Sequence, residues 1–142
     1  MKKMVSMLMF LVAVISYGQR TEPLKGDNFM TIKTQLTADE NFVNFGKYLV
    51  SKGYALETKD KEFLTMRTGA IQTKYLSKFR FNIYFVDSEI RIKPELMVAA
   101  GSWATEYIWI NWKYKGASRD KWAFEKFQPI LAEYGKIYYS KV

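Results

Sequence analysis

The side chains that could do chemistry in this sequence are carboxylates, tyrosines, lysines and serines. The chain contains no histidine and no cysteine, which excludes the usual zinc and copper ligand sets and the histidine- or cysteine-dependent catalytic triads. Asp60 with Glu62, and Asp87 with Glu89, are acidic pairs that could act as general acid and base. Both pairs flank short polar stretches typical of turns, where solvated carboxylates are common. The sequence therefore predicts a protein that is not an enzyme and has no metal or cofactor.

Aromatic and cationic residues alternate with apolar ones in a series of predicted strands. In residues 74–86, every second position from Phe79 to Phe85 is apolar, so these side chains face one side of a sheet and their neighbours face the other. Residues 89–93 and 106–114 alternate in the same way. The second side forms the candidate binding face, which consists of Arg80, Tyr84, Arg91, Lys93, Tyr107, Trp109 and Lys113.

Such a face has several possible roles. Aromatic rings beside cations can stack on sugars or bases while neutralising acidic groups, and they suit a protein partner equally well. Alternatively, the pairs only stabilise the sheet, or the C-terminal tail or a second copy of the chain covers them. We expect a binding or interaction domain of undefined specificity that uses the open face of the sheet.

A second candidate site is a cavity between the helices and the sheet. Phe42, Phe45, Trp122 and Phe127 could line it and hold a small apolar ligand. The alternative function is therefore that of a ligand carrier. The competing interpretation is a filled core, because large aromatic side chains normally close such a space.

The first helix is predicted over residues 38–52. Thr37 can cap its start, and Glu40 three positions later completes a capping box. Gly53 is a natural C-terminal cap. Within the helix, Gly46 lies beside the apolar stripe and would let the helix approach a sheet closely.

Alternating residues and turn signals define the strands. The predicted strands are 29–36, 54–58, 63–68, 74–86, 89–93 and 106–114. Pro94 is expected to end the strand before it, and 95–105 to form a loop that carries a strand end. A second helix is expected to begin at Ser118 and to be kinked or divided at Pro129.

Together these elements predict an α+β fold. Consecutive hairpins favour an antiparallel sheet, here of about five strands, with two helices on one face and the order β-α-β4-α. The tail 136–142 can add a short strand.

The pattern resembles a known type of protein. Residues 47–54, 59–63 and 65–68, with Trp122-Ala123-Phe124 at the start of the last helix, are similar to small secreted bacterial proteins of unknown function. The resemblance covers residues 29–139. It implies a TATA-binding-protein-like or helix-grip domain in a periplasmic setting, and it carries no catalytic or ligand-binding residues.

The N-terminus has the three parts of a secretory signal peptide. Met1–Lys3 is basic, Met7–Ile15 is apolar, and the small residues Ser16 and Gly18 precede Gln19 in the pattern that signal peptidase accepts. The apolar part is shorter than the roughly 20 residues of a membrane span, and no cysteine follows it for a lipid anchor. We expect residues 1–18 to be a cleaved signal peptide, 19–28 a flexible leader and 29–142 a single domain, periplasmic or secreted, with no membrane span after cleavage.

The charge favours acidic partners. The formal net charge is +8, and Lys2 and Lys3 leave with the signal peptide. No run of five or more basic residues occurs, so the pattern does not favour nucleic acid. We expect an envelope protein or an acidic glycan. Without disulfides, stability depends on the core, to which an aromatic content of 17% contributes large buried surfaces.

Overall fold

The structure is a computed structural model. It describes residues 20–24, 26–72, 78–100, 104–109 and 119–141. In 96–100, 104–109 and 119–126 it describes the backbone path but not the side chains. The predicted signal peptide 1–18, the predicted cap Ser118 and parts of the predicted segments 95–105 and 106–114 lie outside them.

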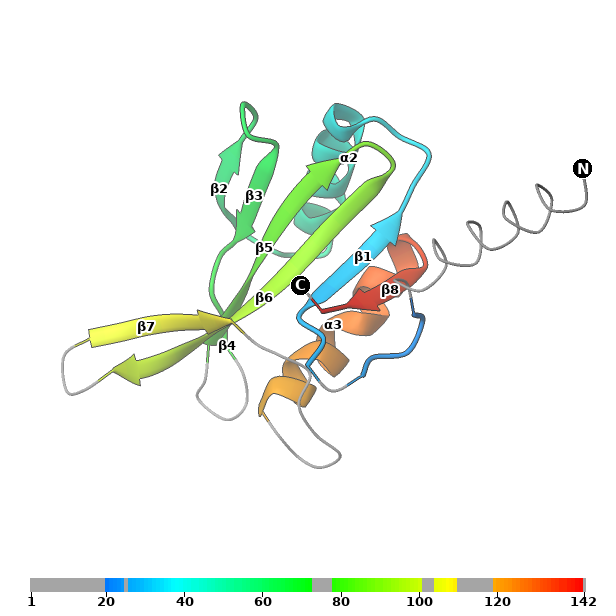
Figure 1. Ribbon diagram of the computed structural model, residues 1–142. Coiled ribbons are helices and arrows are strands. Elements are labelled where there is room, and N and C mark those ends of the chain that lie inside the picture. The colour runs from blue at the N-terminus through cyan, green and yellow to red at the C-terminus, as the bar shows by residue number, and fades with distance from the viewer. Residues whose placement is uncertain (1–19, 25, 73–77, 101–103, 110–118, 142) are drawn as a thin grey trace, which may run out of the picture.

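Ten elements form one sheet and two helices (Figure 1). In chain order they are β1 (Phe29–Lys33), α2 (Ala38–Ser51), β2 (Leu56–Asp60), β3 (Thr65–Thr68), β4 (Ile71–Gln72), β5 (Lys78–Val86), β6 (Glu89–Ala100), β7 (Ala104–Trp109), α3 (Arg119–Tyr134) and β8 (Ile137–Ser140). The strand order is β2-β3-β5-β6-β1-β8, with β4 beside β5 and β7 beside β6. Every strand pair is antiparallel.

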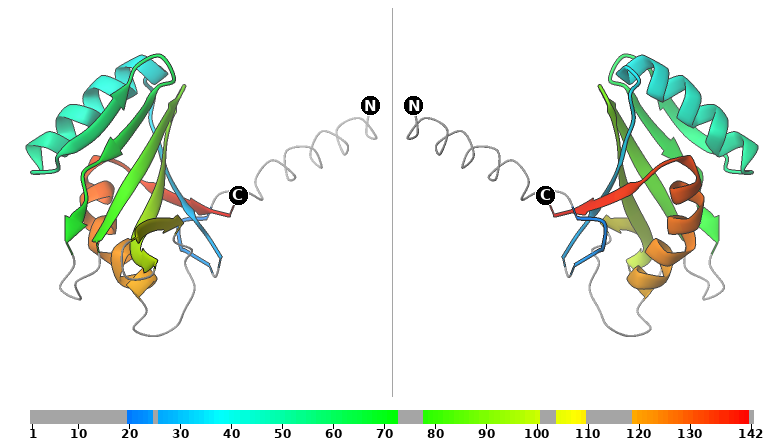
Figure 2. Two further views of the ribbon diagram at one scale, coloured as in Figure 1. Left: turned by 90° about the vertical axis from the view of Figure 1, so that its left-hand side faces the viewer. Right: turned by 90° about the vertical axis from the view of Figure 1, so that its right-hand side faces the viewer.

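Both helices pack on the same face of the sheet (Figure 2). Phe42 of α2 contacts Phe85 of β5, with ring centroids 5.3 Å apart. Phe127 of α3 contacts Phe81 of the same strand at 4.1 Å. Phe81 and Phe85 are four positions apart, so they point to one side of β5. The predicted α+β class, with an antiparallel sheet and two helices, is confirmed.

The predicted number of about five strands is wrong, because the described residues form eight. No local pattern predicts β4, whose two residues pair with the start of β5. The strand predicted from Phe63 begins later, at Thr65, and Phe63 lies in the preceding turn with 72% of its surface exposed. The expected loop at 95–105 is instead largely strand, because β6 continues to Ala100 and β7 begins at Ala104.

Pro94 lies inside β6 rather than at its end. It is opposite Phe81 of β5, but the Phe81 N–H donates to Thr68 Oγ1 on the other side of β5, at 2.9 Å. The two residues are therefore a non-hydrogen-bonded pair, and the proline nitrogen faces away from β5. On that side, β1 pairs with β6 up to Ile92 and β7 begins to pair at Glu95. Among the described residues, neither neighbouring strand pairs with Pro94 itself, so the missing N–H breaks no ladder bond to them.

The first helix agrees closely with its prediction. Thr37 Oγ1 accepts a hydrogen bond from the Glu40 N–H, and the Glu40 carboxylate accepts one from the Thr37 N–H at 2.9 Å. The bond from the Thr37 N–H to the carboxylate lowers the pKa of Glu40 most strongly, and the Thr37 hydroxyl, which also donates to this carboxylate at 2.9 Å, lowers it further. The helix ends at a cap residue, Lys52, followed by Gly53 in the left-handed conformation, with φ +85°.

Gly46 of α2 lies against β3. A Cβ atom at this position would lie 2.9 Å from Cε of Met66, the end of a flexible side chain that would have to shift. This close contact agrees with the predicted role of the glycine. The second helix is not divided at Pro129, because α3 continues across it to Tyr134.

The tail of the chain completes the sheet. β8 pairs with β1, and the Asn28 N–H donates to the Ser140 carbonyl at 3.0 Å. Tyr139 is 1% exposed. Burial raises the pKa of its hydroxyl to about 12, so the side chain stays neutral inside the fold.

We expect replacement of Phe45 by alanine to destabilise the protein strongly. Its ring is fully buried and lies 4.9 Å from that of Tyr134 on α3 and 6.2 Å from that of Phe85 on β5. The cavity should lower the free energy of unfolding by about 3–5 kcal/mol in urea denaturation. Phe63→Ala is the matched control, because the same exchange at this exposed ring should change stability by less than about 0.5 kcal/mol. Similar losses for both variants would contradict the core assignment.

Candidate functional site

The side of the sheet opposite the helices is the outer face, which carries Phe29, Arg67, Arg80, Asn82, Tyr84, Arg91 and Lys93. Four residues of the predicted binding face lie on it, on the paired strands β5 and β6. Tyr84 is directly opposite Arg91, whereas Arg80 is opposite Glu95 and Lys93 is opposite Asn82. The strand register thus brings these four side chains together on neighbouring rows.

The other three predicted residues are less defined. Trp109 pairs with Glu95, and Tyr107 pairs with Met97, between β7 and β6. Their side chains are not among those described. Lys113 lies outside the described residues.

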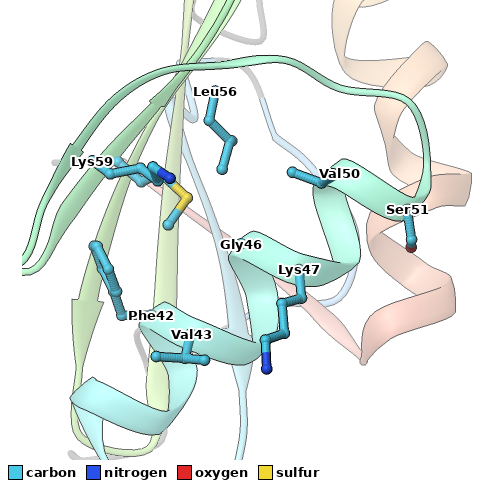
Figure 3. A pocket seen from close by; sticks show the side chains of 9 residues that line it. Phe42, Val43, Gly46, Lys47, Val50, Ser51, Leu56 and Lys59 are labelled. Atoms are coloured by element: carbon cyan, nitrogen blue, oxygen red, sulfur yellow. The ribbon is translucent and has the colours of Figure 1, made fainter.

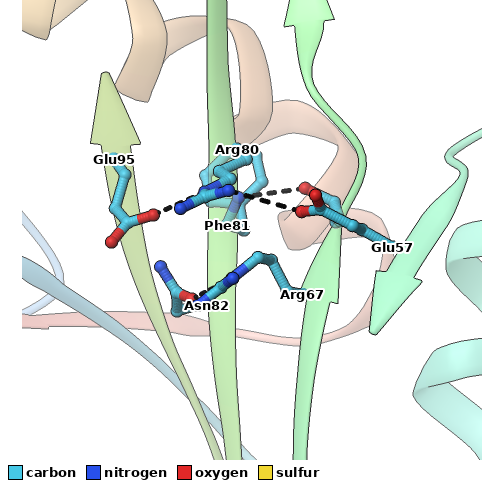
Figure 4. Close-up of polar contacts among 7 residues, drawn as sticks. Glu57, Arg67, Arg80, Phe81, Asn82 and Glu95 are labelled. Carbon is cyan, nitrogen blue, oxygen red and sulfur yellow. Dashed lines mark hydrogen bonds and ion pairs between the residues drawn. The ribbon is translucent and has the colours of Figure 1, made fainter. Parts of the chain in front are cut away.

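Arg80 has a structural role that the sequence did not indicate. Its Nε donates to Glu95 Oε2 at 2.6 Å, and its Nη1 lies 3.4 Å from Glu57 Oε2 of β2 (Figure 4). The side chains of Arg80 and Glu95 are 15% and 9% exposed. This cation is neutralised within the fold and links β2, β5 and β6 across the outer face.

Arg91 is more accessible. Its guanidinium binds Glu89 of the same strand at 2.9 and 3.0 Å, and 51% of its side chain is exposed. An exposed pair of this kind contributes little to stability. Arg91 can therefore exchange its carboxylate partner for one on another molecule at low cost.

An aromatic contact lies beside these cations. The rings of Phe29 and Tyr84 are 6.3 Å apart and tilted by 45°. Lys93 Nζ lies 5.1 Å from the centre of the Phe29 ring, within the range of a cation–π contact. Burial, and then the charge of Glu95, raises the pKa of Tyr84, while Arg67 acts in the opposite direction. Phe29 could have been found from the sequence, because Met30 and Ile32 occupy the inward positions of its strand.

A small polar pocket opens on the same face. It has a volume of about 150 Å³. Its lining residues are Thr58, Thr65, Met66, Arg67, Asn82, Ile83 and Tyr84. Sequence reasoning included Tyr84, and the alternation of residues 78–86 places Asn82 on the same side without assigning it to the site. It missed Arg67, because nothing in the sequence pairs β3 with β5.

The space between the helices and the sheet is filled at its centre. Phe45 and Phe127, two residues of the predicted ligand cavity, are 0% and 2% exposed and pack against other rings. The side chain of Trp122 is not described. Phe42 lies at the edge of the core, where an open groove begins.

This groove runs between α2 and the β2–β3 hairpin (Figure 3). Its volume is about 460 Å³. It is lined by Phe42, Val43, Gly46, Lys47, Val50, Ser51, Leu56, Lys59 and Met66. Apolar side chains dominate, and the charged groups, Lys47 and Lys59, are both cations.

The two acidic pairs have local structural partners. Asp87 accepts a hydrogen bond from the Ala38 N–H at the start of α2, at 2.9 Å. Asp60 accepts one from the Phe63 N–H at 3.0 Å. Within the part of the chain that the structure describes, no cluster of three acidic residues could hold a metal ion. None of the described helices has the length and apolar character required to cross a membrane.

Comparison with known proteins adds no identity. Neither the models of protein families nor the curated protein sequences give a match to this chain. The candidate sites are therefore argued from their geometry and chemistry.

Loss of Arg80 should be far more costly than loss of Arg91. Arg80→Ala leaves the buried carboxylate of Glu95 without its cation, which should lower the free energy of unfolding by about 3 kcal/mol or more. Arg91→Ala removes an exposed pair and should cost less than about 1 kcal/mol. Urea denaturation of both variants measures the difference. Equal effects would show that the Arg80 cluster is not the internal ion pair described above.

Proposed function

We propose that the chain is an exported, non-enzymatic binding domain that uses the outer face of the sheet to contact an acidic partner, either an envelope protein or an acidic glycan. The supporting observation is the combination of Arg91, Lys93 and Arg67 with the Phe29–Tyr84 ring contact on one face. Both described helices lie on the opposite side. Aromatic and arginine side chains grouped in this way are enriched at binding surfaces.

The charges of this face differ in what they can offer a partner. Arg80 is held by two carboxylates, so it contributes to the architecture rather than to recognition. Arg91 is half exposed and has one carboxylate neighbour, Glu89, and Arg67 forms no ion pair with any described side chain. A partner with spaced negative charges would complement Arg91 and Arg67.

Export and ancestry belong to the same proposal. The three-part pattern of residues 1–18 supports a cleaved signal peptide and a periplasmic or secreted location. The order β1-α2, then strands, then α3 supports a relationship to TATA-binding-protein-like or helix-grip domains of secreted bacterial proteins. Such a relationship would indicate the fold of the chain, and it would not by itself indicate that the chain binds DNA.

The proposed function predicts that charge reversal on the outer face weakens binding to acidic polymers. Arg91→Glu should reduce affinity for polyglutamate or polygalacturonate about fivefold to tenfold, because an attraction becomes a repulsion. Lys47→Glu is the matched control, since it changes the net charge equally but lies on α2, on the other side of the sheet. Biolayer interferometry at fixed salt measures both.

Equal weakening by the two variants would mean that net charge alone drives binding, and no weakening by either would refute the use of this face. Thermal denaturation of each variant checks that the fold is intact.

A second candidate function follows from the groove beside α2. We propose that it can hold an anionic amphiphile such as a fatty acid. Apolar side chains from Phe42, Leu56 and Met66 would contact the chain, and Lys47 and Lys59 would attract the carboxylate. The volume of about 460 Å³ lies in the range of small-molecule sites.

This alternative predicts that an acidic side chain in the groove abolishes fatty-acid binding. Val50 is 58% exposed at the groove wall, and Val50→Glu should lower affinity for a fluorescent fatty acid about tenfold or more. Leu24→Glu is the control, because Leu24 is 52% exposed and does not line the groove. Absence of saturable binding to the parent protein, or equal loss in both variants, would remove this function.

A further inference from the structure

We infer that Arg67, Asn82 and Tyr84 form a subsite for a single carboxylate group on the outer face. This inference deepens the proposed function and rests on it, because it names the chemical group through which an acidic partner would be held. It concerns the small polar pocket between β2, β3 and β5 rather than Arg91 and Lys93 of β6.

The charge balance of Arg67 differs from that of the other described arginines. Arg20 is paired with Asp27, Arg80 with Glu95 and Glu57, and Arg91 with Glu89. Arg67 has no carboxylate partner among the described side chains, although it is half-buried in β3. Its single side-chain hydrogen bond runs from Nε to Asn82 Oδ1, at 2.9 Å.

This bond leaves the outer part of the guanidinium available. Arginine has five N–H donors in a planar fork, and the four on Nη1 and Nη2 have no partner in the described part of the chain. The planar fork matches the two oxygens of a carboxylate in a bidentate pair. Because Asn82 holds Nε, the fork is oriented before a ligand arrives (Figure 4).

Asn82 supplies an independent sign of an incomplete site. Its side chain is 7% exposed, and its Nδ2 is buried without a hydrogen-bond partner among the described atoms. Buried donors are nearly always satisfied in native proteins. The Arg67 bond fixes the amide orientation, with Oδ1 toward the guanidinium, so the unsatisfied group is a donor that an anionic ligand or its bound water could use.

The other residues that line the pocket also suit a carboxylate ligand. Thr58, Thr65 and Tyr84 contribute hydroxyl groups, and no acidic residue lines the pocket. Burial raises the pKa of Tyr84, so its hydroxyl is protonated at neutral pH and can donate. The volume of about 150 Å³ corresponds to about five water molecules at roughly 30 Å³ each. A carboxylate with a short carbon stem fits this space.

Titration with acetate tests the subsite directly. In two-dimensional ¹H–¹⁵N spectra, acetate should cause saturable shifts of the Asn82 side-chain amide and of the β3 and β5 backbone amides, whereas neutral acetamide should not. Arg67→Gln should weaken acetate binding about tenfold or more, because a charge-assisted pair is lost. Arg67→Lys keeps the charge but not the fork and should give an intermediate affinity. Lys136→Gln, which neutralises an exposed cation before β8 at the far edge of the sheet, should leave the affinity within about twofold.

Three results would overturn the inference. These are the absence of saturable shifts in the parent protein, equal acetate binding by Arg67→Gln and the parent, and stronger binding of inorganic phosphate than of acetate. Dispersed spectra of each variant verify that it is folded. Retained polymer binding by Arg67→Gln, together with no acetate binding by the parent, would refute the subsite alone, whereas unchanged polymer binding by Arg91→Glu refutes the proposed function.

Discussion

Packing of the inward aromatic row of β5 against both helices is the interaction on which the rest of this structure depends. Phe79 and Phe81 contact Phe127 of α3, while Phe85 contacts Phe42 and Phe45 of α2. A single strand thus holds two helices that are far apart in the sequence. In a chain without disulfides, such burial is the main source of stability.

β5 also determines which side chains lie on the outer face, because the residues between its inward phenylalanines must point to that side. Arg80, Asn82 and Tyr84 are therefore fixed in a row whose spacing is set by the core behind them. Arg80 is used to join strands through two carboxylates. Arg67, brought beside Asn82 by the β3–β5 register, has no such partner among the described residues. The outer face thus carries two kinds of cation. Arg80 stabilises the sheet through its ion pairs, whereas Arg67 is available to a ligand.

Local signals in the sequence were sufficient for part of this arrangement. The capping box at Thr37 and the glycine at position 53 located α2 almost to the residue, since both act within one turn of the helix. The alternation within 78–86 correctly identified the inward side chains of β5. The roles of residues that depend on contacts with another strand could not be predicted from the sequence. The Arg80–Glu95 and Arg67–Asn82 contacts each join positions 15 residues apart, and only the register places them together.

Pro94 illustrates the same limit and has a consequence for motion. The rule that proline ends a strand failed because the Pro94 nitrogen faces away from β5, so the β5–β6 ladder continues past it. The N-terminal half of β6 is consequently held between β5 and β1, while the half beyond Pro94 lies between β5 and β7 (Figure 1). Among the described residues, neither β1 nor β7 pairs with both halves of β6. Because the two halves have different second neighbours, we expect their amides to open with different free energies in hydrogen exchange.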